Sequence, residues 1–105
     1  MTVDWDRIKH QLDKVSKPTR YIGAEYNIQT KEWTTTALKV VLAFPDLYEI
    51  GQSHLGLRIL YELINLQPDM LAERVFAPWL DFQQLIREHG VRLYSLETKR
   101  PLSDF

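Results

Sequence analysis

The residues best suited to chemistry in this sequence lie in one loop, directly after an apolar run at 38–44. The loop carries two carboxylates, Asp46 and Glu49, on either side of Tyr48, and ends with the imidazole of His54. In an open α/β sheet, ligands bind outside the carboxyl ends of the strands, where a strand passes into its helix. The loop is therefore predicted to border a small-molecule site.

Eight residues at this edge are candidate ligand contacts. Seven belong to the loop, and the eighth is a tryptophan that follows the next apolar segment. They are Pro45, Asp46, Tyr48, Glu49, Gly51, Ser53, His54 and Trp79. Four of them also have a structural role that would explain them: a turn at Asp46, a solvated or capping Glu49, a loop hydrogen bond for His54, and core packing for Trp79.

The sequence contains no recognisable catalytic or metal-binding set. It has no cysteine, which excludes disulfides, thiolate zinc sites and cysteine-held iron–sulfur clusters within the chain. Neither a Walker A string nor G-x-G-x-x-G is present, and no nucleophile–base pair can be assembled. We therefore predict no catalytic residue and no metal site, and expect that the chain is not an enzyme by itself.

Composition limits the partners. The 105 residues suffice for one domain with a modest core, and the formal net charge of -1 leaves no electrostatic footprint for nucleic acid. No stretch approaches the roughly 20 apolar residues of a membrane span, and the N-terminus lacks the apolar core of a secretory signal. The expectation is a cytoplasmic chain without membrane or nucleic-acid partners.

Two regions are predicted, 1–36 and 37–105. In the first, apolar residues recur at helical spacing from Trp5 to Val15, and Pro18 ends this helix. An extended lead-in follows, with a short strand expected at Tyr26–Ile28.

The second region alternates strands and helices. Strands are expected at 38–44, 73–76 and 91–96, with helices between them, the first capped by Ser53. This β-α-β-α-β order predicts an α/β fold, a partial doubly wound sheet of three parallel strands preceded by an N-terminal helix. Three strands make a thin sheet. We therefore expect either an incomplete α/β domain or an exposed edge covered by the N-terminal arm or a second copy.

Five strings in order resemble one family. They are KPTRYIG (17–23), FPDLYEIG (44–51), SHLGL (53–57), ERVFAPW (73–79) and SLETKRPLSDF (95–105). The chain resembles, from Lys17 onward, the N-terminal region of bacterial radical S-adenosylmethionine proteins with a cobalamin-binding-like domain ahead of the radical barrel. The resemblance implies a flavodoxin-like sheet of strand order 2-1-3-4-5, of which this chain would supply 2-1-3.

The resemblance also implies cobalamin as a cofactor of the full-length proteins. Their iron–sulfur cluster and S-adenosylmethionine depend on a three-cysteine motif that this chain lacks. Base-off cobalamin domains carry Asp-x-His-x-x-Gly, whose histidine ligates cobalt. Here Gln52 stands two residues before His54 and Gly56 two residues after it, so His54 is not expected to ligate cobalt.

The leading hypothesis is therefore a fragment or stand-alone homologue of that N-terminal domain, non-catalytic by itself, which packs against a radical S-adenosylmethionine catalytic domain. The alternative is a structural or interaction module without a cofactor, which self-associates through an exposed sheet edge.

Overall fold

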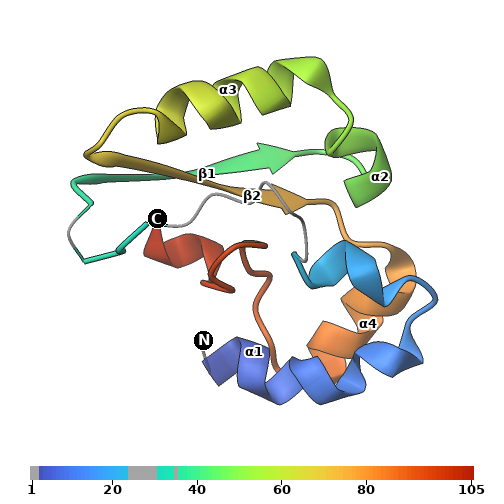
Figure 1. The fold of residues 1–105 in the computed structure, drawn as a ribbon. Helices are drawn as coiled ribbons and strands as arrows, with labels where there is room; N and C mark the ends of the chain where they lie inside the picture. Colours follow the sequence, from blue (N-terminus) through green and yellow to red (C-terminus); the bar gives the residue numbers. More distant parts are fainter. Residues whose placement is uncertain (1–2, 24–30, 35) are drawn as a thin grey trace.

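The computed structural model describes residues 3–23, 31–34 and 36–105. In that part of the chain, one sheet of two parallel strands, β1 (Leu38–Phe44) and β2 (Met70–Phe76), forms the centre. Helix α3 (Leu55–Asn65) covers one face of the sheet (Figure 1). Helix α4 (Leu80–Glu88) and the C-terminal segment lie on the other side. The remaining short helices are α1 (Val3–Ile8), η1 (Lys9–Lys14), η2 (Pro18–Tyr21), α2 (Tyr48–Gly51) and η3 (Leu102–Asp104).

The β1–α3–β2 unit follows the sequence pattern closely. The apolar run forms β1 with the predicted bounds, and β2 pairs with it in parallel from Leu38–Met70 to Phe44–Phe76. Leu57 and Tyr61, one helical turn apart, are buried against the sheet. An α/β chain with parallel strands is therefore confirmed.

The N-terminal region packs on α4 rather than on the sheet. The predicted helix is present as α1 followed by the tighter η1, and Ile8, Leu12 and Val15 from this stretch are buried. They share one apolar cluster with Phe82 and Leu85 of α4. The amide and hydroxyl of Ser16 both donate to Asp81, which fixes the end of this stretch onto the start of α4. The strand expected at Tyr26–Ile28 lies outside the described residues.

The predicted third strand, Val91–Leu96, does not form, so neither the three-stranded sheet nor the 2-1-3 order is present among the described residues. The Leu96 amide donates to the Arg74 carbonyl, as a strand beside β2 would begin. The Glu97 side chain then takes the amide of Arg74, and the chain folds back at Lys99, whose φ is 60°. The segment therefore lies at the outer edge of β2, whereas the order 2-1-3 would place it beside β1.

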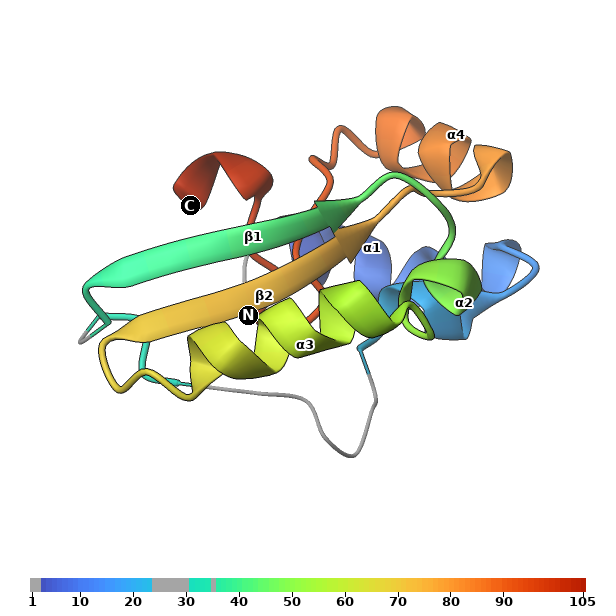
Figure 2. The same ribbon diagram turned by 90° about the horizontal axis from the view of Figure 1, so that it is seen from above.

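The outer edge of β2 is closed by side chains instead of a strand. The Asn65 side-chain amide donates to the Ala72 carbonyl, and its oxygen accepts from the Ala72 amide. Lys31 donates to the Met70 carbonyl at 2.6 Å. Seen from the α3 side, the helix runs along β2, whereas β1 lies at the open side of the sheet (Figure 2).

Candidate functional site

The predicted ligand loop begins where β1 ends, and it binds the end of β2. The Asp46 carbonyl accepts a hydrogen bond from the Ala77 amide at 2.9 Å, which ties the two strand ends together. Its side-chain oxygen Oδ1 accepts from the Leu47 amide at 2.7 Å, directly before α2. Pro45 beside it is exposed. Asp46 therefore has the turn role, with one carboxylate oxygen already engaged.

Gly51 and Tyr48 pack α2 onto the aromatic ends of the strands. A Cβ at position 51 would lie 2.2 Å from Phe76 Cε1 and 3.0 Å from Phe44 Cδ1, so only glycine allows this approach. The Tyr48 ring meets the Phe76 ring edge-on, with centroids 5.4 Å apart. Both predicted site residues therefore serve the packing of the loop.

The cap of α3 is His54, not Ser53 as predicted. His54 has extended backbone angles, and its Nδ1 accepts from the Leu57 amide at 3.2 Å. The Ser53 hydroxyl instead donates back to the carbonyls of Glu49 and Ile50. The imidazole satisfies one of the free amides at the start of the helix, as an N-cap oxygen normally does.

This cap determines what His54 can do. Because Nδ1 accepts a hydrogen bond, the proton of the neutral ring is on Nε2. A cobalt-ligating imidazole would need the opposite arrangement, with the proton on Nδ1 and Nε2 free to coordinate. Metal binding by His54 would therefore cost the cap of α3.

An N-terminal arm, Pro18–Gly23, occupies the crevice at the carboxyl edge. Arg20 Nε donates to Glu49 Oε1 at 2.7 Å, which joins η2 to α2. The hydrogen bond from Arg20 holds the pKa of the Glu49 carboxyl below its usual value. Glu49 is therefore an ionised partner of the arm rather than a proton donor.

Tyr21 fills the space next to this ion pair. Its ring stacks on Phe82 with centroids 3.7 Å apart and planes 9° from parallel. Its hydroxyl accepts from the Trp79 amide, and its carbonyl accepts from the Tyr94 hydroxyl at 2.9 Å. Burial raises the pKa of Tyr94, which keeps that hydroxyl protonated as a donor.

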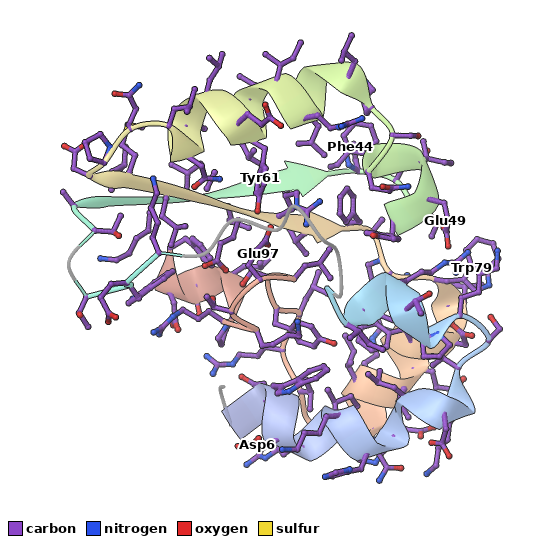
Figure 3. All side chains as sticks on the ribbon, in the orientation of Figure 1. Asp6, Phe44, Glu49, Tyr61, Trp79 and Glu97 are labelled. Carbon is purple, nitrogen blue, oxygen red and sulfur yellow. The ribbon has the colours of Figure 1, made fainter. Side chains whose placement is uncertain are left out.

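The space left at this edge is too small for a cofactor. The cavity lined by the arm, Tyr48, Phe76 and Tyr94 measures about 20 Å³. That volume holds about one water molecule, whereas small-molecule pockets measure roughly 300–1,000 Å³. Trp79, with 49% of its surface exposed, lies outside this space (Figure 3).

A second hollow lies on the opposite side of the loop, between β1 and α3. It is an open groove of about 510 Å³. Its lining is apolar apart from one imidazole: Leu42, Ala43, Phe44, His54, Gly56, Leu57, Ile59 and Leu60. The eight predicted residues are therefore divided. His54 borders this groove, Glu49 binds the arm, and Trp79 belongs to the α4 side, so they do not converge on one ligand.

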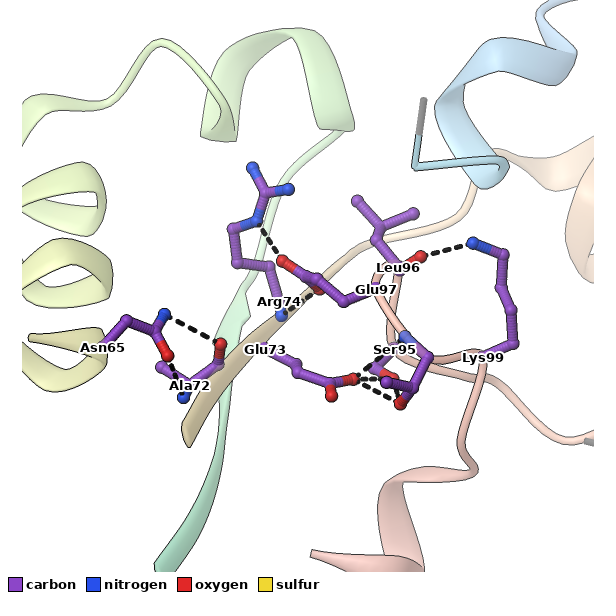
Figure 4. A network of polar contacts seen from close by, with 9 residues as sticks. Asn65, Ala72, Glu73, Arg74, Ser95, Leu96, Glu97 and Lys99 are labelled. Atoms are coloured by element: carbon purple, nitrogen blue, oxygen red, sulfur yellow. Dashed lines mark hydrogen bonds and ion pairs between the residues drawn. The ribbon is translucent and has the colours of Figure 1, made fainter. Parts of the chain in front are cut away.

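A buried polar cluster beneath the sheet was not predicted (Figure 4). Glu73 is fully buried in β2, and its Oε1 accepts from the Ser95 hydroxyl at 2.6 Å and from the Thr98 hydroxyl at 2.7 Å. The Thr98 amide also donates to it. These bonds attach the C-terminal segment to the centre of β2.

The neighbouring residue of β2 forms a buried ion pair on the α3 face. Arg74 Nε donates to Glu97 Oε2 at 2.8 Å, and the Arg74 amide donates to Oε1 at 2.9 Å. The guanidinium lies over the Tyr61 ring, 4.7 Å from its centroid. Burial raises the pKa of Glu97, and the charge of Arg74 opposes that rise. Both charges therefore serve to hold the segment in place.

Lys99 completes the attachment. Its ammonium donates to the carbonyls of Ile22 and Leu96 and lies 4.9 Å from the centroid of the Trp5 ring. Burial lowers the pKa of Lys99 to about 8. A Cβ on Gly23 would lie 2.4 Å from the Leu96 carbonyl oxygen, which explains the glycine at the end of the arm.

One sequence signal could have revealed this cluster. Glu73 and Arg74 are adjacent charges inside a segment expected to be a buried strand, and buried charges require partners.

No group of three or more His, Cys, Asp or Glu side chains suited to a metal occurs in the described part. Nor is any described helix long and apolar enough to cross a membrane.

Comparison with known families gives a match for the part of the chain that contains the buried polar cluster of β2 and the C-terminal segment. Residues 56–105 match the model of a family described as radical SAM proteins, N-terminal, where SAM is S-adenosylmethionine. This part of the chain is similar to the N-terminal region of radical SAM proteins. The resemblance to the N-terminal region of radical SAM proteins is thereby confirmed. No curated protein and no solved structure matches the chain significantly.

The radical SAM N-terminal match spans two of the strings that carried the resemblance, ERVFAPW and SLETKRPLSDF. The structure joins them: Glu73 and Arg74 of the first bind Ser95, Glu97 and Thr98 of the second. Arg74 of the first string and Glu97 of the second therefore form a contact that holds the fold together, and Glu73 adds hydrogen bonds to Ser95 and Thr98 through Oε1.

Proposed function

We propose that this chain is a non-catalytic N-terminal module of a radical SAM protein. Its role is to present a preformed carboxyl edge to the catalytic polypeptide, which would supply the cluster and the reacting groups. The family match of residues 56–105 supports the parent. The finer assignment, a cobalamin-binding-like and flavodoxin-like domain, is part of this proposal.

The observation that carries the proposal is the filled crevice. Arg20 and Tyr21 take the place where an open α/β sheet receives its ligand, and about 20 Å³ is left. The polar groups of the loop are used locally: Asp46 on an amide, Glu49 on Arg20, and His54 as a cap. This arrangement suits a scaffold better than a site for chemistry.

The surface at this edge suits contact with another polypeptide. Ile50 of α2 has 51% of its surface exposed, Trp79 49% and Leu80 68%, and all three follow the carboxyl ends of the paired strands. Cobalamin, the cofactor that the resemblance implies, is far larger than the remaining cavity. In this proposal it lies outside the arm, over this apolar surface, with its other walls supplied by the radical SAM protein.

Titration with hydroxocobalamin tests the filled crevice. The visible spectrum is expected to stay unchanged in the presence of excess wild-type chain, because the arm fills the crevice and the other walls of the proposed site belong to the catalytic polypeptide. The Arg20→Ala variant, which releases the arm from Glu49, is the comparison. A saturable shift with the wild-type chain would contradict the proposal.

A further inference from the structure

We propose that one buried water molecule joins Glu73 of β2 to Arg100 of the C-terminal segment. The water accepts a hydrogen bond from Arg100 Nε and donates one to Glu73 Oε2. This site lies beneath the sheet, away from the carboxyl edge assigned to the catalytic polypeptide. The inference therefore does not depend on that assignment.

The first argument is that both atoms are buried and lack a partner. Among the described residues, neither Glu73 Oε2 nor Arg100 Nε has a hydrogen-bond partner. Glu73 is fully buried, and its other oxygen, Oε1, accepts from the hydroxyls of Ser95 and Thr98 and from the Thr98 amide. Figure 4 shows these bonds ending at one of the two carboxylate oxygens. Because a buried polar atom without a partner is costly, native proteins rarely leave one unsatisfied.

The second argument is that one hydroxyl links the two residues. Ser95 Oγ donates to Glu73 Oε1 at 2.6 Å and accepts from the Arg100 amide at 3.2 Å. The backbone of Arg100 is therefore held beside the Glu73 carboxylate. Its side chain starts from the same place in the buried polar cluster.

The Arg100 side chain also lies against the face of the sheet to which Glu73 points. Its guanidinium carbon is 4.0 Å from the centroid of the Trp33 ring, and the Lys39 ammonium is 5.3 Å from the same centroid. Lys39 is two residues from Val41, which pairs with Glu73 in the sheet. Residues two apart in a strand share a face, so Trp33 and Arg100 lie beneath the part of the sheet that carries Glu73.

The chemistry of the two atoms selects water as the ligand. A carboxylate oxygen only accepts hydrogen bonds and an arginine Nε only donates them, so a water molecule can satisfy both. The Thr98 hydroxyl can accept the second proton of this water, which gives it about three partners, the usual number for a buried water. A proton on Oε2 would not serve instead, because it would be a second buried donor without an acceptor.

A metal ion fits this site less well. Calcium takes roughly six to eight oxygen ligands. The described residues offer no group of three or more His, Cys, Asp or Glu side chains that could hold a metal. The positive charge of Arg100 beside the carboxylate also makes a second cation unnecessary.

A crystal structure of the wild-type chain tests the proposal directly. The expected result is one ordered peak within about 2.5–3.2 Å of both Glu73 Oε2 and Arg100 Nε. A direct hydrogen bond between these two atoms, or no peak between them, would overturn the proposal. A peak at about 2.3–2.6 Å with roughly six or more oxygen neighbours would identify a cation and would overturn it as well.

Hydrogen exchange supplies an independent readout. The Thr98 amide donates to Glu73 Oε1, so its exchange rate reports how firmly the carboxylate is held. Arg100→Met removes the Nε donor. The Thr98 amide is then expected to exchange about tenfold faster while circular dichroism stays native, as loss of a hydrogen bond to a charged group predicts.

Arg87→Met is the matched control, because Arg87 is exposed on α4, and it should leave this rate unchanged. A crystal structure of Arg100→Met should also lack the water peak. Equal Thr98 exchange rates in the wild type and Arg100→Met would contradict the bridge, and so would a peak that persists in that variant.

Discussion

Replacing Glu97 with alanine should remove much of the stability of this fold. The carboxylate is the shared acceptor for the Arg74 side chain and the Arg74 amide, at 2.8 and 2.9 Å. Both side chains are buried, with 9% of Arg74 and 0% of Glu97 exposed. Glu97→Ala therefore removes a buried charge partner and leaves a β2 amide without this acceptor.

The expected loss follows from these two contacts. Breaking a buried ion pair on one side costs about 3–5 kcal/mol, and a buried amide without an acceptor costs about 1–3 kcal/mol. The two overlap, because both arise at one residue, so we expect a loss of about 4 kcal/mol. The total free energy of unfolding of a protein domain is roughly 5–15 kcal/mol, so the variant should be only marginally folded.

Urea unfolding followed by circular dichroism measures this loss. Glu62→Ala, on the exposed side of α3, is the control and should stay within about 0.5 kcal/mol of wild type. The double variant Arg74→Met/Glu97→Met should lose much less than the sum of the single changes, because it leaves no buried charge. A cost of under about 1 kcal/mol for Glu97→Ala would refute the role assigned to the pair.

Three further predictions concern single residues. Gly51→Ala should lower the free energy of unfolding in urea by about 1–3 kcal/mol, since its methyl would overlap Phe76. Gly56→Ala should change it by less than about 1 kcal/mol, because the gain in helix propensity at this exposed position is opposed by a methyl 3.1 Å from His54 Cε1. Equal effects of the two variants would contradict the packing of α2. His54→Ala should lower the free energy of unfolding by about 1 kcal/mol and His54→Asn by much less, because asparagine can also cap a helix. Equal melting temperatures for the wild type and both variants would contradict the capping role of His54. The pKa of Lys99 is lowered from 10.5 to about 8, so between these pH values the unfolded state binds more protons than the folded state. The free energy of unfolding should therefore rise with pH in this range. Lys99→Met should abolish that rise, and Lys9→Met should not.

The sequence was most informative where contacts are local. The bounds of β1 follow from an apolar run broken only by Lys39, and α3 follows from the spacing of Leu57 and Tyr61. The third strand was predicted wrongly because 91–96 has strand composition, whereas the structure holds Leu96 and Glu97 at the outer edge of β2 and forms no strand there. Which edge of the sheet receives this segment depends on tertiary contacts that periodicity does not reveal.

The candidate site shows the same limit. The loop was placed correctly at the carboxyl edge, because strand ends and prolines mark it. Its occupant was not predicted, since the contact between Arg20 and Glu49 spans 29 residues and passes through an irregular arm. Ser53 was predicted to cap α3 from its residue type alone, whereas the backbone geometry makes His54 the N-cap.

The central claim is that this chain serves as a module for a radical SAM protein, and binding in trans tests it most directly. Isothermal titration would measure the wild-type chain against a protein of the same family whose own N-terminal region has been deleted. The account predicts saturable one-to-one binding, weakened about tenfold or more by Trp79→Ser/Leu80→Ser and unchanged by Leu66→Ser at the far end of α3. Absence of binding by the wild-type chain, or binding indifferent to the carboxyl-edge variant, would contradict it.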